Sequence, residues 1–378
     1  MNFKAQPLSG LKVLDFSTLL PGPMAGLLLA EAGAEVVKIE RPGSGEEIRH
    51  YHPKWGRDSA IFAMLNRGKK SLALDLKDSR QIAMLEPLLA DVDVLIEQFR
   101  PGVMERLGLG YKAVSALNPK LIYCSITGYG QTGPKADLAG HDINYIGDTG
   151  LLSLSLGQSD NPTVPPVLAA DLAGGSYPAV MNILLALMHR QNTGRGTHLD
   201  IAMTDNIFML MTWAQGQAAA ADMWPESSRE LLTGGSPRYQ IYPTQDGRFI
   251  AAGPLEQKFW ENFCRIIELE PEYHDDRKDP AAVIARVREL IASKRAGDWR
   301  RLFYGEDCCC SIVATLQEAF NDQHFAARGL FDHVLRNEDG AEMPATPVSV
   351  VPQFRTSPDK PKHAPSLAAN NDEFLNKQ

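Results

Sequence analysis

The chain has 378 residues, of which 44% are hydrophobic and 22% are charged, a composition typical of globular proteins and not of disordered ones. Single hydrophobic cores usually stop growing near ~250–300 residues, so this length predicts two domains. The formal net charge of -8 argues against a nucleic-acid partner, because binding a phosphate backbone requires a basic stripe. A small anionic ligand bound by a local basic patch stays compatible with this charge.

No charge-free apolar run approaches the ~18 residues of a membrane span, and we expect no membrane association. Residues 1–7 lack the apolar segment of a secretory signal, and the last three residues match no targeting tripeptide, so we expect a cytoplasmic location. The five cysteines form neither a disulfide framework nor a Cys-x-x-Cys zinc pair: Cys124, Cys264 and the run Cys308-Cys309-Cys310. We therefore expect reduced, mostly buried thiols and no metal site.

Strands and helices alternate over the first third of the chain. The turn at 21–23 leads into a helix at 24–32 that Gly33 ends. Five segments have the pattern of buried strands: 11–16, 35–40, 71–76, 92–97 and 121–126. This alternation predicts an α/β fold with a doubly wound parallel sheet, in a Rossmann-like large domain.

The loop after the first strand tests a dinucleotide-binding interpretation. Residues 17–23 read Ser-Thr-Leu-Leu-Pro-Gly-Pro and contain no Gly-x-Gly-x-x-Gly fingerprint. Two prolines also remove backbone N–H donors that a pyrophosphate would need. Glu40 alone is weak evidence for a ribose contact, so the sequence does not predict NAD binding.

The second half of the chain changes character near residue 231. A helix near 177–192, a strand at 198–202 and a helix near 204–221 precede the change. The segments 239–242 and 249–252 flank Asp246-Gly247, which is a hairpin signal, and helices follow near 255–268, 280–294 and 297–304. We predict these domains: a large domain at 1–200, a linker helix and connector at 201–230, a smaller α+β domain at 231–329, and a return of 330–378 to the large domain. Residues 340–378 should be extended or frayed.

Basic residues follow or precede several predicted strands. In open α/β sheets, ligands bind beyond the carboxyl ends of the strands, where Arg41 and Arg100 are expected. Arg67, Lys69 and Lys70 can join them in a site for an anion such as phosphate. The alternative is that all five are ordinary solvated charges.

His141 and Asp171 are the candidates for proton transfer. His141 follows a glycine where a helix can begin, and a helix amino end favours the neutral imidazole, although a local capping role fits equally well. Asp171 is either the N-cap of a helix or part of a ligand site, and the following Gly174-Gly175 favours a close approach of a ligand. Glu256, near another predicted helix start, fits a helix-dipole role as well as a functional one.

These motifs, in this order, resemble family III CoA-transferases, the carnitine dehydratase and bile-acid-inducible protein family, and within it the α-methylacyl-CoA racemase branch. The matching segments run over nearly the whole chain: Val13–Phe16, Lys38–Gly43, Asn66–Ser71, Phe99–Met104, Gly140–Tyr145, Asp171–Gly175, Gly234–Pro237, and Glu256 with Phe259.

The resemblance implies an interlocked homodimer that acts in acyl-CoA and lipid metabolism. Coenzyme A then enters as part of the substrate, with no tightly bound cofactor, and lies on the large domain. His141 and Asp171 match the two bases that exchange the α-proton, and Glu256 matches a supporting acid from the second subunit. Asp142 matches the residue whose backbone N–H faces the thioester oxygen. The implied CoA contacts come from the residues Arg41, Arg67, Lys69, Lys70, Arg100 and Tyr129.

Two alternatives remain open. In the CoA-transferase branch, an aspartate that matches Asp171 attacks the thioester and carries the acyl group, so Asp171 alone does not discriminate. His141 favours the racemase branch. Arg238 stands where racemases tend to have an aromatic residue, and a cation there could pair with a carboxylate of the acyl group or of an acceptor acid. The other alternative is a CoA-binding protein without turnover.

Overall fold

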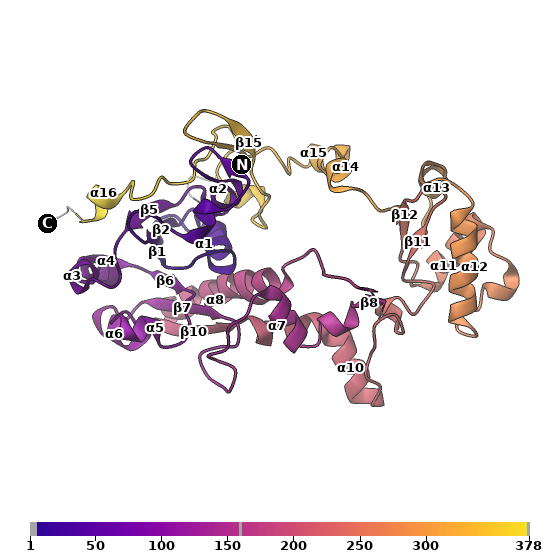
Figure 1. Ribbon diagram of the computed structural model, residues 1–378, viewed down its shortest axis with the longest axis horizontal. Helices are drawn as coiled ribbons and strands as arrows, with labels where there is room; N and C mark the ends of the chain where they lie inside the picture. The colour runs from indigo at the N-terminus through magenta and orange to yellow at the C-terminus, as the bar shows by residue number, and fades with distance from the viewer. Residues whose placement is uncertain (1–5, 159–160, 376–378) are drawn as a thin grey trace. The chain divides into compact units, whose positions relative to one another are not determined.

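The computed structural model describes residues 6–158 and 161–375 and divides the chain into two compact units (Figure 1). The first unit comprises Met1–Thr149, Val167–Leu210 and His324–Gln378. The second unit comprises Gly150–Pro166 and Met211–Gln323. Each unit has its own hydrophobic core.

The units differ from the predicted domains at three places. Residues 150–166, predicted within the large domain, belong to the second unit and contain the short strands β8 (Gly157–Gln158) and β9 (Asn161–Pro162). The predicted linker 201–230 divides at Leu210, because α9 (Met203–Ile207) packs on the helical turn around Asp171. The chain returns to the first unit at His324 instead of residue 330.

A six-stranded parallel sheet forms the centre of the first unit, in the order β10-β7-β6-β1-β2-β5. The middle strand β1 pairs with β2 on one side and β6 on the other, so that Val13 lies beside both Val36 and Val94. The strands span Lys12–Asp15 (β1), Glu35–Glu40 (β2), Lys70–Ala73 (β5), Val94–Glu97 (β6), Ile122–Thr127 (β7) and Thr197–Ala202 (β10). The predicted parallel α/β sheet is confirmed.

Helices cover both faces of this sheet (Figure 1). On one face, α1 (Pro21–Glu31) packs on α8 (Tyr177–Thr193), and Asp15 of β1 points toward α1. On the other face, Leu14 joins a core that includes α4 (Glu86–Asp91) and α6 (Tyr111–Leu117). The remaining short elements of this unit span Lys54–Trp55 (β3), Asp58–Ser59 (β4), Ala60–Asn66 (α2), Ser79–Ala83 (α3), Val103–Arg106 (α5) and Asp142–Asp148 (α7).

The continuous helical stretch Ala170–Thr193 is long and apolar enough, by length and composition alone, to cross a membrane, which the sequence had not suggested. It begins with a π-helical turn and continues as α8, and one side of α8 packs on α1 and the sheet. A core helix of a soluble protein meets the same criterion. The stretch is therefore weak evidence for a membrane span.

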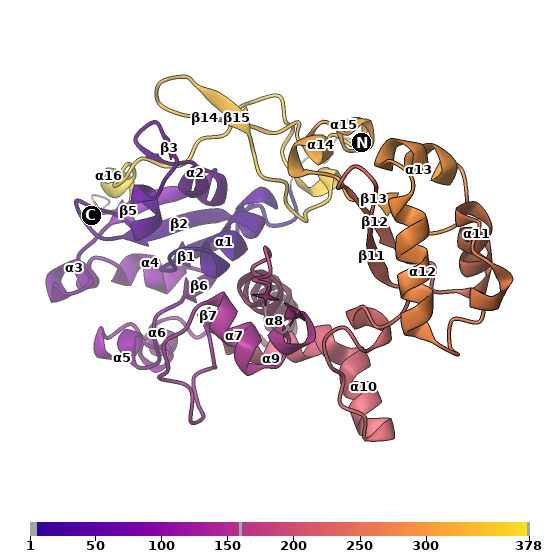
Figure 2. The same ribbon diagram turned by 45° about the vertical axis from the view of Figure 1, so that its right-hand side comes forward.

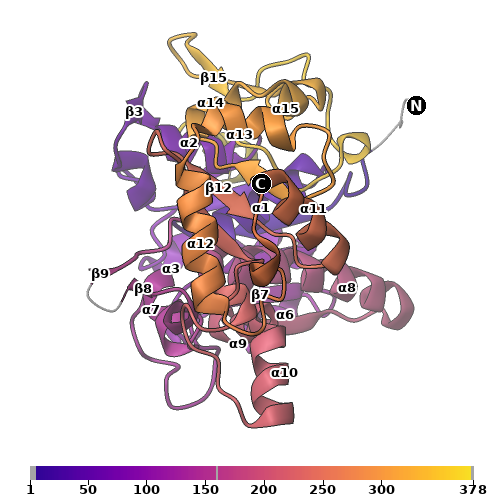
Figure 3. The ribbon, with the colours of Figure 1, turned by 90° about the vertical axis from the view of Figure 1, so that its right-hand side faces the viewer.

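The second unit is a small α+β fold. The hairpin of β11 (Gln240–Pro243) and β12 (Phe249–Ala252) is confirmed, and β13 (Cys310–Ile312) extends the sheet antiparallel to β12. Figure 2 shows the helices gathered on one side of these strands, and Figure 3 looks onto that helical layer. The helices span Gln257–Ile267 (α11), Pro280–Ala292 (α12) and Ala296–Phe303 (α13), with α10 (Thr212–Ala221) and α14 (Leu316–Phe320) elsewhere in the unit.

The C-terminal segment is anchored over its described residues, so of the two alternatives predicted for 340–378, extended or frayed, the frayed one is wrong up to residue 375. After α15 (Gln323–Ala327), a hairpin forms from β14 (Val334–Arg336) and β15 (Glu342–Pro344). Just before and within α16 (Asn371–Leu375), the side chains of Asn370 and Asn371 accept hydrogen bonds from the backbone N–H groups of Ser71 and Ala73 in β5. Side-chain amides thus satisfy an edge strand that would otherwise expose unpaired backbone groups.

Glu31, at the end of α1, holds this returning segment in place. Its buried carboxylate pairs with Arg67 at 2.7 Å, with Lys362 at 2.7 Å and with Arg355 at 3.1 Å. Burial by itself would raise the pKa of Glu31, but the neighbouring Lys362, Arg67 and Arg355 lower it to about 2.

We expect Glu31→Gln to destabilise the protein by about 3 kcal/mol, because it leaves buried cations without their counter-charge. The stabilisation from Glu31 is present above its ordinary pKa of 4.5 and is lost as the pH falls toward 2. Denaturant unfolding at pH 7 and pH 3 measures both effects. An equal loss of stability at the two pH values would contradict the role assigned to the charge.

Candidate active site

A cavity of about 440 Å³ lies in the first unit, beyond the carboxyl ends of the central strands. The loop after β1 contributes Leu19, the start of α1 contributes Pro21, and the loop after β6 contributes residues 98–101. Because the strand order reverses between β1 and β6, these two loops diverge and leave a crevice, which is where open α/β sheets bind ligands. His141, Asp171 and Arg100 all line this one cavity.

His141 reaches the cavity from the amino end of α7. It is the N-cap residue in extended conformation, its side chain is exposed, and its backbone N–H donates to Asn144 Oδ1 at 3.0 Å. Two glycines before it make room for an aromatic side chain of α7. A Cβ on Gly128 or Gly140 would lie 2.4 or 2.7 Å from the ring of Tyr145, so both glycines make room for that ring.

Asp171 lies in a π-helical turn, Ala170–Ser176, which precedes α8. The N-cap is Ala169, so the capping interpretation of Asp171 is wrong. Single π turns are uncommon and occur often at functional sites. The predicted ligand approach at Gly174-Gly175 is also corrected: a Cβ on Gly174 would lie 2.5 Å from the carbonyl oxygen of Met203, and one on Gly175 would lie 3.1 Å from Pro21. The glycines allow the turn to pack closely.

Asp142 connects the two candidate bases. It is buried, and its Oδ1 accepts a hydrogen bond from the backbone N–H of Asp171 at 3.0 Å. Burial and the nearby charge of Asp142 raise the pKa of the Asp171 carboxyl to about 6, while the neighbouring His141 lowers it. As the first residue of α7, Asp142 also has a backbone N–H without a partner inside the helix. With its pKa raised to about 6, the Asp171 carboxyl can gain and lose a proton near neutral pH.

We expect Asp142→Asn to shift the pH profile of any reaction that uses Asp171 as a base. The asparagine keeps an oxygen for the Asp171 N–H but removes the charge that raises the pKa of Asp171. For the native enzyme, kcat/KM should fall as the pH drops through about 6, where Asp171 becomes protonated. In the variant this fall should occur at lower pH. A profile of kcat/KM against pH measures it, and an unchanged acid limb would contradict the coupling.

The predicted basic site divides into free and paired residues. Arg41 and Arg100 are exposed, and the structure shows no ion pair for either among residues 6–158 and 161–375. Arg100 lies near Tyr145: burial raises the pKa of Tyr145, the charge of Asp171 raises it further, and Arg100 lowers it. Arg100 thus brings an available cation to the cavity wall.

Arg67, Lys69 and Lys70 do not join Arg41 and Arg100 in the structure. Arg67 is buried and binds Glu31 together with the carbonyl oxygens of Met64 and Thr346. Lys69 is buried and binds Asp15 at 2.9 Å, and Lys70 binds Glu35 and Glu373. Because carboxylates already neutralise these three cations, the interpretation as an anion site is corrected to a structural role for them.

Tyr129, Arg238 and Glu256 lie outside the cavity. Tyr129 donates to Asp148 Oδ2 at 2.8 Å and packs edge-on against Tyr145. Arg238 forms a two-point ion pair with buried Asp276, at 3.0 and 2.7 Å, and stacks over Trp260, so the predicted substrate-side cation is already neutralised. Glu256 is the exposed N-cap of α11 in the second unit.

Cysteines and possible metal ligands add little to this site. Cys124, Cys264 and Cys308 are buried, in line with the expectation of mostly buried thiols, and Cys309 is exposed. Over residues 6–158 and 161–375, no group of three histidine, cysteine or acidic side chains could hold a metal ion.

Sequence reasoning missed several residues of the cavity and its support. Thr127 lines the cavity, and its buried Oγ1 has no hydrogen-bond partner among the described residues. Leu19 lines it in a left-handed conformation, with φ of 64°, held by the buried Glu46. The conformation of Leu19 has no local sequence signal, because its partner Glu46 lies 27 residues further along the chain. The unpaired hydroxyl of Thr127 has no local sequence signal either.

Comparison with known proteins gives a consistent result over the whole chain. The profile of CoA-transferase family III matches residues 8–371. An α-methylacyl-CoA racemase of Mus musculus is 35% identical over 97% of this chain and 92% of its own. A succinyl-CoA:glutarate CoA-transferase of Mus musculus is 32% identical over 94% of this chain and 83% of its own. A crystal structure of a CAIB/BAIF family protein from Brucella suis superposes with a TM-score of 0.79 at 27% identity, covering 98% of this chain and 99% of that one.

The matched profile and the relatives cover far more than half of the chain, and the parallel α/β sheet agrees with the solved fold. The chain belongs to CoA-transferase family III.

Proposed function

We propose that this enzyme epimerises 2-methylacyl-CoA thioesters at the α-carbon by proton transfer between two bases. The observation that carries the proposal is that His141 and Asp171 line one cavity, with the pKa of Asp171 raised to about 6. An imidazole is the side chain most often used for acid–base catalysis. The Asp171 carboxyl, with its pKa raised to about 6, can exchange a proton near neutral pH. Arg100 at the rim is suited to an anionic part of the CoA moiety.

In the proposed reaction, one base removes the α-proton, and the pair of electrons left on the carbon moves into the thioester carbonyl to form an enolate. The other base, protonated, returns a proton to the opposite face of the carbon, and the carbonyl forms again. His141 and Asp171 exchange these roles when the reaction runs in reverse. The backbone N–H of Asp142 is a candidate donor to the enolate oxygen, and one such donor contributes about 3 kcal/mol of barrier lowering.

A CoA-transferase is the second candidate, because relatives with that name are nearly as similar to the chain as the racemases are. In that reaction Asp171 attacks the thioester carbonyl, CoA leaves as a thiolate, and the acyl group stays on the carboxylate as an anhydride. His141 has no necessary role in this step, which favours the racemase. Arg238 is not an argument for a substrate with a second carboxylate, because Asp276 and Gln257 already bind its guanidinium.

The deciding experiment is incubation with 2-methylbutanoyl-CoA, the smallest 2-methylacyl thioester with a stereocentre, in D₂O without an acceptor acid. We expect deuterium at the α-carbon and loss of optical purity, measured by mass spectrometry and chiral analysis. No exchange, together with a hydroxylamine-sensitive acyl adduct on Asp171, would favour the transferase. Binding of the thioester without exchange or adduct would leave a CoA-binding protein.

The proposal includes a homodimer in which the second subunit contributes Glu256, as the family resemblance implies. Apolar side chains on α8 support it: Met181 is 56% exposed and Met188 is 63% exposed. They lie in a stripe with Tyr177, Leu184 and Leu185 at helical spacing, and monomeric proteins rarely expose such a continuous apolar surface. We expect a dimer in analytical ultracentrifugation, and a well-folded monomer would contradict this part of the proposal.

A further inference from the structure

We propose that Glu46 is a positioning residue for the thioester site, because it holds Leu19 against the cavity where the substrate binds. The inference rests on the proposed function, since it concerns the same cavity as His141 and Asp171. It adds a residue outside the cavity that sets the shape of one wall. It also explains a strained backbone conformation that local sequence does not require.

Leu19 has φ of 64°, in the left-handed region that leucine seldom adopts. Such a conformation persists only when the surrounding structure imposes it, and it occurs often at ligand sites. The conformation brings Leu19 and Pro21 into the wall of the cavity that also contains His141 and Asp171. A relaxed Leu19 would therefore change the surface that meets the substrate.

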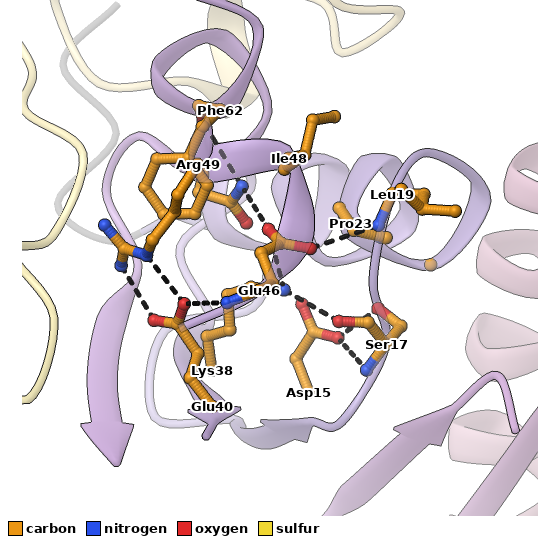
Figure 4. A network of polar contacts seen from close by, with 12 residues as sticks. Asp15, Ser17, Leu19, Pro23, Lys38, Glu40, Glu46, Ile48, Arg49 and Phe62 are labelled. Atoms are coloured by element: carbon orange, nitrogen blue, oxygen red, sulfur yellow. Dashed lines mark hydrogen bonds and ion pairs between the residues drawn. The ribbon is translucent and has the colours of Figure 1, made fainter. Parts of the chain in front are cut away.

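Glu46 provides the contact that imposes this conformation. Its Oε2 accepts the backbone N–H of Leu19 at 3.0 Å, and the carboxylate is nearly fully buried (Figure 4). The other oxygen, Oε1, accepts from Asn66 Nδ2 at 3.2 Å and pairs with Lys38 Nζ at 3.3 Å. The two oxygens thus have separate partners, one in the cavity loop and one in the core.

Other side chains hold the backbone on either side of Leu19, at Ser17 in the loop and in the first turn of α1. Lys38 donates to the carbonyl oxygen of Ser17 at 2.7 Å, and Lys69 donates to that of Pro23 at 2.8 Å. Gln98 accepts from the N–H of Gly22 at 3.0 Å. With the backbone held on both sides, the Glu46 bond controls the middle of the loop, where Leu19 lies (Figure 4).

The geometry suggests Glu46→Gln as the main variant. Glutamine has one accepting oxygen, and Lys38 with Asn66 will attract it, because both are donors and one is charged. The amide NH₂ then faces the N–H of Leu19, and the bond to Leu19 is lost while the size of the side chain is kept. Asp58→Asn is the matched control, because Asp58 binds Arg49 in the same network and does not contact the loop.

The experiment measures the dissociation constant of 2-methylbutanoyl-CoA by titration calorimetry, which does not depend on turnover. We expect Glu46→Gln to weaken binding about tenfold and Asp58→Asn to leave it within about twofold, measured at a temperature at which both variants are fully folded. Leu19→Gly should also weaken binding about tenfold, because it removes the wall. Adding Glu46→Gln to Leu19→Gly should then change little, since glycine adopts positive φ without being held.

Three results would overturn the inference: unchanged binding in Glu46→Gln, equal weakening in Asp58→Asn, or a full additional effect of Glu46→Gln in the Leu19→Gly background. If Glu46→Gln does not fold, Leu19→Gly alone decides, because unchanged binding there excludes Leu19 as a wall of the site. Failure of the proposed function appears separately, as native enzyme that binds the thioester but exchanges no α-proton.

Discussion

Asp171→Asn should reduce racemisation of 2-methylbutanoyl-CoA by about 10³-fold, the typical contribution of a positioned acid–base group. Asparagine keeps the shape of the side chain and the backbone contact to Asp142, but it cannot accept a proton from carbon. The transferase hypothesis predicts a loss of acyl transfer in the same variant, since the amide is also a poor nucleophile. The variant therefore tests whether the cavity is the active site at all.

The measurement is the initial rate of loss of optical purity, with the dissociation constant of the thioester determined beside it. We expect binding to change little, because Asp171 acts on the α-carbon and not on the CoA moiety. Asp148→Asn is the control, since this carboxylate in α7 binds Tyr129 and Lys135 away from the cavity. Substantial racemisation by Asp171→Asn would remove Asp171 from the mechanism.

His141→Ala should slow racemisation by a similar factor, about 10²–10⁴, because inversion requires a base on each face of the α-carbon. Here the two hypotheses differ. A transferase needs Asp171 as nucleophile, and loss of His141 should leave formation of the acyl adduct on Asp171 largely intact. The His141 side chain is exposed at the cavity, so the substitution should not disturb the core.

Chiral analysis of the product and trapping of the adduct with hydroxylamine separate the two outcomes for His141→Ala. Unimpaired racemisation would exclude His141 as a base. Impaired adduct formation would indicate that His141 helps bind or orient the thioester in a transferase.

The sequence predicted those features that depend on local pattern. Apolar segments separated by helical ones placed the strands of the parallel sheet, and Asp246-Gly247 placed the hairpin of β11 and β12. The position of His141 after a glycine predicted its place at the start of α7. Each of these features is set by residues close together in the chain.

Features that depend on distant partners were not predictable. Arg67 and Lys69 looked like ligand-binding cations, but Glu31 and Asp15, which neutralise them, lie 36 and 54 residues away in the sequence. The anchoring of the C-terminal segment by Asn370 likewise joins residues 299 positions apart. The glycines at 174 and 175 indicated close approach correctly, but the approaching group is Met203 and not a ligand.

The most direct test of the two-base arrangement uses each enantiomer of 2-methylbutanoyl-CoA separately in D₂O. With His141→Ala, we predict that one enantiomer exchanges its α-proton with retention of configuration and the other does not exchange. With Asp171→Asn, the preference should reverse, because each variant keeps the base on the opposite face. If both variants lose exchange from the same enantiomer, or both keep exchange from both, His141 and Asp171 do not act on opposite faces of the α-carbon.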